Sequence, residues 1–160
     1  MIQKATLTQL PEILKLYARA RSFMAQTGNP DQWGDVYPPE EMIREDIKNG
    51  KSYVNLENGN ICAVFYFAVE EDPTYGYIED GAWLDPSPYG VIHRVASNGT
   101  VPGTLRRCLD FCREKIRHLR IDTHADNYPM QHLLDKMGFT RCGIVYMEDG
   151  SPRIAYERME

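Results

Sequence analysis

The sequence predicts an α/β protein, with a mixed α+β sheet of about seven strands and helices on both of its faces. Three observations lead to this fold class. Strand-like and helix-like stretches follow one another in the order β-α-α-β-β-β-α-β-α-β-β. Residues 61–69 are apolar at nearly every position, as in a central strand that is buried on both faces. A loop with Gly103 joins a strand to a helix.

The first fifty residues predict one strand and two helices. Residues 2–7 alternate like a strand, and Thr8 is placed to cap the helix that follows it. This helix carries an apolar stripe from Leu10 to Met24, and Gly28-Asn29-Pro30 ends it. A second, shorter helix is expected over residues 39–48, because Asn49-Gly50 is typical of a helix C-terminus.

The remaining elements alternate between strands and helices. Strands are expected over residues 52–57 and 61–69, joined by a tight turn, and over 89–97 after an acidic, aromatic loop. A helix then starts near Gly103 and another at Pro129. The last three strands are expected over residues 119–123, 139–147 and 153–158. We find no repeat or long linker, so residues 1–160 are expected to form a single domain.

Composition narrows the class of partner. The chain is 42% hydrophobic and 26% charged, with a net charge of −5. An acidic chain is a poor candidate for nucleic-acid binding, which needs a basic face, whereas it suits a cationic partner such as an amine. Because we find no membrane span and no signal peptide, we expect no membrane partner and a cytoplasmic location. The four cysteines are then expected to be reduced, and Cys108 and Cys112, one helical turn apart, to be small core residues.

The strand-loop-helix unit over residues 91–116 is the most informative local feature. A helix N-terminus offers unpaired backbone N–H groups and a partial positive charge, which suit a pyrophosphate. Pro102 fits the first turn, and Gly103 permits close approach of the backbone. The same pattern is also typical of an ordinary turn and cap with no ligand.

The C-terminal half resembles the GNAT family of N-acetyltransferases. In that family a strand is followed by an Asn, a short amphipathic helix and a Gly-Phe pair that opens the next strand. Here Arg120 to Thr123 form the strand, followed by Asn127 and by Gly138-Phe139 at the same spacing. The order of elements over the whole chain is also similar to this family.

The resemblance implies acetyl-CoA as a co-substrate. The backbone of Val95, Ala96 and Ser97 would pair with the pantetheine arm, and N–H groups near Gly103 and Thr104 would hold the pyrophosphate. Asn127 would lie beside the cofactor where the two central strands separate. By family analogy, the chain is also expected to form a possible homodimer.

The chain departs from the family pattern in two ways. The phosphate loop of the family reads Gln/Arg-x-x-Gly-x-Gly/Ala, and Thr100, Gly103 and Leu105 stand at these three positions, so only the middle glycine is kept. Many members have a tyrosine near the end of the last helix, which protonates the departing thiolate. Leu134 stands there in this chain, so the resemblance supplies no general acid.

His93 is the first candidate for the base that acetyl transfer to an amine requires. Strand alternation predicts that it shares a face with Val95, and that Arg94 points to the opposite face in a structural role. The competing interpretation of His93 is a partly buried histidine of the sheet. Asp122 and His124, at the end of the neighbouring strand, are further candidates.

Asp122, His124 and Asp126 alternate at that strand end, which is compatible with a metal site. We favour local capping of the next helix and expect no metal. Aromatic and acidic loop residues could hold a cationic substrate, and the candidates are Trp33, Tyr37, Glu79 and Trp83. The two tryptophans are equally explained as packing residues. Tyr128 is either a surface residue or a substitute proton donor, and the sequence leaves this open.

The predicted function is transfer of an acetyl group from acetyl-CoA to a primary amine of a small molecule or peptide. A second hypothesis is a non-catalytic GNAT-like module that binds CoA or another ligand as a sensor. A third is a structural relative without a CoA site.

Overall fold

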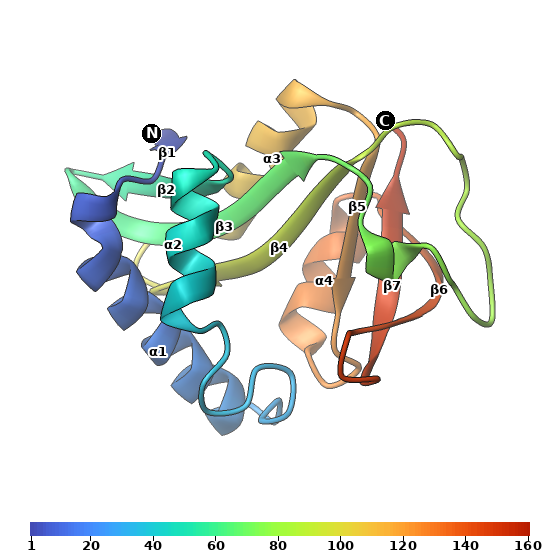
Figure 1. Cartoon of the computed structure of the whole chain (residues 1–160), viewed down its shortest axis with the longest axis horizontal. Helices are drawn as coiled ribbons and strands as arrows, with labels where there is room; N and C mark the ends of the chain where they lie inside the picture. Colours follow the sequence, from blue (N-terminus) through green and yellow to red (C-terminus); the bar gives the residue numbers. More distant parts are fainter.

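The structure, a computed structural model, describes every residue from Met1 to Glu160. Two 3-10 turns, Leu7–Gln9 and Pro73–Tyr75, accompany the main elements. The main elements are β1 (Ile2–Lys4), α1 (Leu10–Gln26), α2 (Glu40–Lys48), β2 (Ser52–Glu57), β3 (Asn60–Val69), β4 (Gly90–Ser97), α3 (Thr104–Lys115), β5 (Leu119–Thr123), α4 (Tyr128–Lys136), β6 (Thr140–Tyr146) and β7 (Pro152–Arg158) (Figure 1). Their order is the predicted one.

The seven strands form one mixed sheet in the order β1-β2-β3-β4-β5-β7-β6. Only β4 and β5 are parallel, and α3 is the crossover between them. All other neighbouring strands are antiparallel. The mixed sheet of seven strands confirms the predicted fold class.

Helices cover both faces of the sheet (Figure 1). On one face, α3 and α4 pack Cys108, Leu109 and Leu134 against strand residues that include Ile92. On the other face, α1 and α2 cover the sheet through residues such as Ile13 and Ile43. The strand β3 is buried over most of its length, as its apolar sequence predicts.

The start of α1 differs from the prediction. The first strand ends at Lys4 instead of residue 7, Thr6 is the N-cap of the 3-10 turn Leu7–Gln9, and Gln9 instead of Thr8 is the N-cap of α1. At this turn the Thr6 N–H donates to the Gln9 side chain over 2.9 Å and the Gln9 N–H donates to the Thr6 carbonyl over 3.0 Å, so the chain turns before Thr8.

The four cysteines are buried free thiols, and Cys108 and Cys112 lie in the core as predicted. No helix of the structure combines the length and the apolar character that crossing a bilayer would require.

Candidate active site

The main cavity of the molecule opens where β4 and β5 separate. The parallel pairing of these strands extends only from Gly90 with Leu119 to Ile92 with Ile121. Beyond this point the strands spread apart in a V, which is visible in Figure 1. A cavity of about 700 Å³ lies here, lined by both strands, by the segments after α1 and β3, and by the β6–β7 hairpin. Its place at the C-terminal ends of parallel strands is a common ligand position in α/β proteins.

A β-bulge in β4 decides which side chains enter this cavity. His93 pairs with Tyr66 and Ala96 with Val64, so Arg94 and Val95 together stand opposite Phe65. The extra residue reverses the alternation of the strand. His93 and Arg94 therefore share the face of α1 and α2, while Val95 packs on the face of α3 and α4.

Two sequence predictions about β4 are therefore wrong. His93 and Val95 lie on opposite faces, and Arg94 lies on the same face as His93. Both errors have one cause, because strict alternation holds only for a strand without a bulge. All three residues nevertheless line the cavity, since it spans the gap at the edge of the strand.

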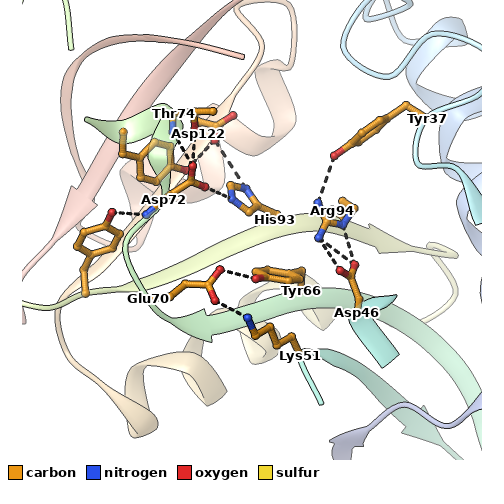
Figure 2. A network of polar contacts seen from close by, with 12 residues as sticks. Tyr37, Asp46, Lys51, Tyr66, Glu70, Asp72, Thr74, His93, Arg94 and Asp122 are labelled. Carbon is orange, nitrogen blue, oxygen red and sulfur yellow. Dashed lines mark hydrogen bonds and ion pairs between the residues drawn. The ribbon is translucent and has the colours of Figure 1, made fainter. Parts of the chain in front are cut away.

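His93 lies between two carboxylates (Figure 2). Its Nε2 is 2.5 Å from Asp72 Oδ2, and its Nδ1 is 3.8 Å from Asp122 Oδ2. The buried hydroxyl of Tyr75 donates to the same Asp122 oxygen over 2.7 Å. When Asp72 is ionised, Nε2–H is the donor to it, and Nδ1 of the neutral imidazole is left as an acceptor.

Asp72 is held as an anion by its turn. It caps the turn Pro73–Tyr75, and its Oδ1 accepts from the Thr74 N–H and hydroxyl over 2.9 and 2.7 Å. Burial by itself would raise the pKa of Asp72, but the hydrogen bonds from His93 and Thr74 outweigh it and lower the pKa to about 2. The ring of His93 is thus fixed by a carboxylate that stays ionised at neutral pH.

Two of the six residues predicted to bind the cofactor line the cavity. Val95 and Asn127 line the cavity, whereas Ala96 is buried against the α1 side. Asn127 caps α4 by accepting from the Met130 N–H, and it donates to the Gln32 side chain over 3.0 Å. The other three positions, Ser97, Gly103 and Thr104, follow the end of β4 and lead into α3.

The predicted substrate residues separate into two groups. Trp33 and Tyr37 line the cavity, with their rings 6.2 Å apart. Glu79 and Trp83 are not among the cavity-lining residues, because they pack toward β6 and β5. Glu79 bridges to Ile144, and Trp83 stacks on the Arg120 guanidinium at 4.2 Å.

The remaining candidates have local structural roles. His124 accepts from the Asp126 N–H over 3.0 Å and does not line the cavity, but the predicted capping of the next helix by these residues is wrong, because Asn127 caps α4. Asp122 faces Tyr75 and His93 instead. Asp122, His124 and Asp126 therefore do not converge on one point. Leu134 is fully buried in the core, and Tyr128 is 64% exposed outside the cavity.

Several cavity residues were missed in the sequence. Asp72 and Glu70 were recognised only as part of an acidic loop, and nothing local indicates that Asp72 reaches His93, 21 residues away. Arg153 and Gln32 also line the cavity, where Arg153 donates to the Gln32 carbonyl over 2.8 Å.

Acidic side chains dominate the charge of the cavity. Glu70 is paired with Lys51 and Arg94 with Asp46. The remaining acidic side chains of the lining outnumber the one remaining arginine, Arg153, and they are Asp31, Asp72, Asp122, Glu148 and Asp149. This field favours a positively charged ligand.

No family model matches the chain, and no curated protein sequence does. Solved structures do match. An acetyltransferase of the GNAT family from Streptococcus agalactiae is 31% identical, with 100% of this chain and 95% of that chain covered and a TM-score of 0.91. A GNAT-family acetyltransferase from Listeria monocytogenes is 16% identical, covers 100% and 94%, and has a TM-score of 0.74.

The NatC complex bound to Gag peptide and CoA is also similar, at 13% identity, with 100% and 98% covered and a TM-score of 0.66. At such low identity the likeness shows the fold alone. The Streptococcus protein is similar in sequence as well, over nearly the full length of both chains. The chain is therefore an acyltransferase and belongs to the GNAT family of acetyltransferases.

Proposed function

We propose that this protein transfers an acetyl group from acetyl-CoA to a primary amine of a small molecule or peptide, with His93 as the general base. The observation that carries the proposal is the position of His93, with Asp72 on one ring nitrogen and Asp122 near the other, in the cavity where β4 and β5 separate. An oriented imidazole with a free acceptor nitrogen is the arrangement that proton abstraction requires.

Three features of the cavity edge fit acetyl-CoA. Beyond Ile92 the edge of β4 that faces β5 has no strand partner, so its backbone groups are free to bind the pantetheine arm. Gly103 adopts φ +73° before α3, and a Cβ built there would meet nothing within 4 Å. Thr123 lines the cavity with a buried hydroxyl that has no hydrogen-bond partner in the protein, as expected of a group that a ligand satisfies.

The open space at Gly103 leaves room for a pyrophosphate even though the loop departs from the family pattern. Thr100 and Leu105 replace residues of the pattern, but backbone N–H groups, not side chains, would hold the pyrophosphate. Helix α3 leaves its first N–H groups without partners inside the helix. NatC, which shares the fold, was solved with CoA and a peptide, and this supports an acyl-CoA donor here.

The acceptor side of the cavity suits an ammonium group. Asp122 is 3.8 Å from His93 Nδ1, so a cation held by this carboxylate would lie beside the base. Trp33 and Tyr37 supply aromatic faces, and the acidic lining favours cations over anions. Both a small amine and the N-terminus or a lysine of a peptide fit this chemistry.

The proposed reaction proceeds by direct attack. His93 Nδ1 removes a proton from the ammonium group, either directly or through water, and the neutral amine attacks the thioester carbon. The N–C bond forms and the C–S bond breaks, which releases the CoA thiolate. The ammonium nitrogen loses two protons in all: the first goes to His93 and from there to solvent, and the second leaves as the amide forms and protonates the thiolate through solvent. Neither Leu134 nor Tyr128 is placed to donate it.

The test is CoA thiol release from acetyl-CoA with a panel of a monoamine, a diamine and a peptide with a free lysine. We expect turnover with at least one amine, and a loss of kcat of about 10²–10⁴-fold in His93→Ala with acetyl-CoA affinity nearly unchanged. His132→Ala, an exposed histidine of α4 outside the cavity, is the matched control. Wild-type turnover by His93→Ala would remove His93 from the mechanism. Binding of acetyl-CoA without turnover on any amine would favour a sensor.

A further inference from the structure

Arg94 has an unusual backbone for a strand residue. It lies within β4 with φ +50°, a left-handed conformation that is unfavourable for a residue with a side chain. This residue is also one of the two that form the bulge opposite Phe65. Such a conformation persists only where surrounding contacts stabilise it.

The side chain of Arg94 provides these contacts (Figure 2). Its Nε and Nη2 donate to the two carboxylate oxygens of Asp46 in α2, over 2.9 and 3.0 Å. Its Nη1 donates to the Tyr37 hydroxyl over 3.2 Å, and the guanidinium lies 4.6 Å from the centre of the Tyr66 ring. A two-point contact between arginine and a carboxylate fixes orientation as well as distance.

The backbone of Arg94 is held from the other side. Its carbonyl accepts from the buried Tyr17 hydroxyl of α1 over 2.8 Å. The side chains of Arg94 and Asp46 are each only 10% exposed, so solvent weakens their attraction little. The bulge is therefore anchored to α1, to α2 and to the loop between them.

We propose that Arg94 is a positioning residue, whose ion pair with Asp46 holds the β4 bulge next to His93 and thereby fixes the strand edge that follows it. The inference rests on the proposed role of His93 in acetyl transfer. Residue 93 is next to the bulge, and its ring packs on the same Tyr66 that Arg94 contacts, at 5.6 Å. Without the bulge, the residues after position 94 would change faces, and the β4 edge proposed for the cofactor would change with them.

The contacts of the Arg94 guanidinium favour this structural role over a direct contact with the substrate. All three guanidinium nitrogens donate to Asp46 or Tyr37, and one face is against Tyr66. Arg153 differs, because its donors contact only the neutral acceptors Gln32, Ser151 and Pro152.

Two substitutions at one position distinguish these roles. Arg94→Gly and Arg94→Ala both remove the charge, but only glycine adopts a positive φ without strain. We expect both variants to lose kcat, and Arg94→Gly to keep at least about fivefold more of it than Arg94→Ala. Arg44→Ala, which removes an exposed ion pair with Glu40 in α2, should keep the wild-type kcat. Equal kcat in the two Arg94 variants, with folding verified by circular dichroism at the assay temperature, would overturn the proposal.

Asp46→Asn keeps the shape of the partner and removes its charge, which covers the case in which Arg94→Ala does not fold. We expect its kcat to fall at least about tenfold, with acetyl-CoA affinity measured by calorimetry also reduced. An unchanged kcat in this folded variant contradicts the proposal. If His93→Ala keeps its turnover, the proposed base fails, while the acetyl-CoA affinities of the Arg94 variants still report whether the bulge shapes the β4 edge.

Discussion

At the scale of single residues, the site depends on how Asp72 and His93 are fixed before any substrate binds. The turn Pro73–Tyr75 orients the Asp72 carboxylate through Thr74, and this carboxylate in turn orients the imidazole. Tyr75 keeps its proton, because burial and the neighbouring Asp122 raise its pKa. It therefore stays a donor to Asp122 and holds that carboxylate beside His93.

The lowered pKa of Asp72 predicts a pH-dependent contribution to stability. Its pKa is about 2 in the folded protein against 3.8 for a free side chain. The contribution is thus fully present above about pH 4 and is lost as the pH falls toward about 2. Relative to wild type, we expect Asp72→Asn to lower the free energy of unfolding near pH 7 by on the order of 1 kcal/mol.

Urea unfolding of both proteins near pH 7 and near pH 3 measures this effect. The two free energies should approach one another at the lower pH, because protonation removes the same charge from wild type. A difference that stays constant with pH would show that the Asp72 charge does not stabilise the fold.

At the scale of elements, the cavity results from the separation of two parallel strands and from the helix that connects them. Pairing between β4 and β5 ends at Ile92 and Ile121, and α3 begins after the left-handed Gly103. Because α3 connects two parallel strands, its N-terminus follows the C-terminal end of β4, and the C-terminal end of β5 lies at the same side of the sheet. A free strand edge and free helix N–H groups are therefore available to one extended ligand.

Gly103→Glu tests the placement of the pyrophosphate. A side chain at this position has open space, so steric conflict inside the protein is small. We expect loss of acetyl-CoA binding of at least about 100-fold, because the carboxylate would repel the phosphates. Isothermal titration calorimetry measures the acetyl-CoA affinity of the variant and of the wild type.

Gly59→Glu in the β2–β3 hairpin is the matched control, since it has φ +80° and equally open surroundings. It carries a comparable backbone strain and the same charge, and its affinity should remain at the wild-type value. Equal affinities of the two variants would contradict the phosphate site at α3.

At the scale of the whole molecule, contacts across the cavity join the two halves of the chain. Gln32, in the loop between α1 and α2, accepts from Asn127 of α4 through its side chain and from Arg153 of β7 through its carbonyl. The acceptor side of the cavity is thus built from segments about 120 residues apart in sequence. A second long-range cluster joins β5, β7 and the loop before β4.

In that cluster the fully buried Glu157 of β7 bonds to His118 and to Arg120 Nε, the latter over 2.8 Å. It also accepts from the Leu84 N–H over 2.5 Å, which fixes the loop that carries Trp83. Glu157→Ala would leave Arg120 buried without its counter-charge. We expect a loss of about 3–5 kcal/mol in the free energy of unfolding, measured with urea.

Glu148→Ala removes an exposed glutamate and should change this free energy by less than about 0.5 kcal/mol. Similar small effects for both variants would mean that the Glu157 cluster adds little net stability.

The sequence by itself determined the order of elements, the buried central strand β3 and the family resemblance through Asn127 and Gly138-Phe139. These signals are local: apolar periodicity, turn residues and caps depend on neighbours within a few positions. His93 was proposed for the same reason, since a histidine within a predicted strand is recognised from the sequence alone, and its role stays a prediction.

Only the tertiary structure decided which partners His93 and Arg94 have. Asp72 reaches His93 across 21 residues and Asp46 reaches Arg94 across 48. The bulge between them is strained locally and is stabilised by those distant partners, so no periodicity in β4 could reveal it. Side-chain alternation is a property of the strand, whereas its interruption is a property of the packed molecule.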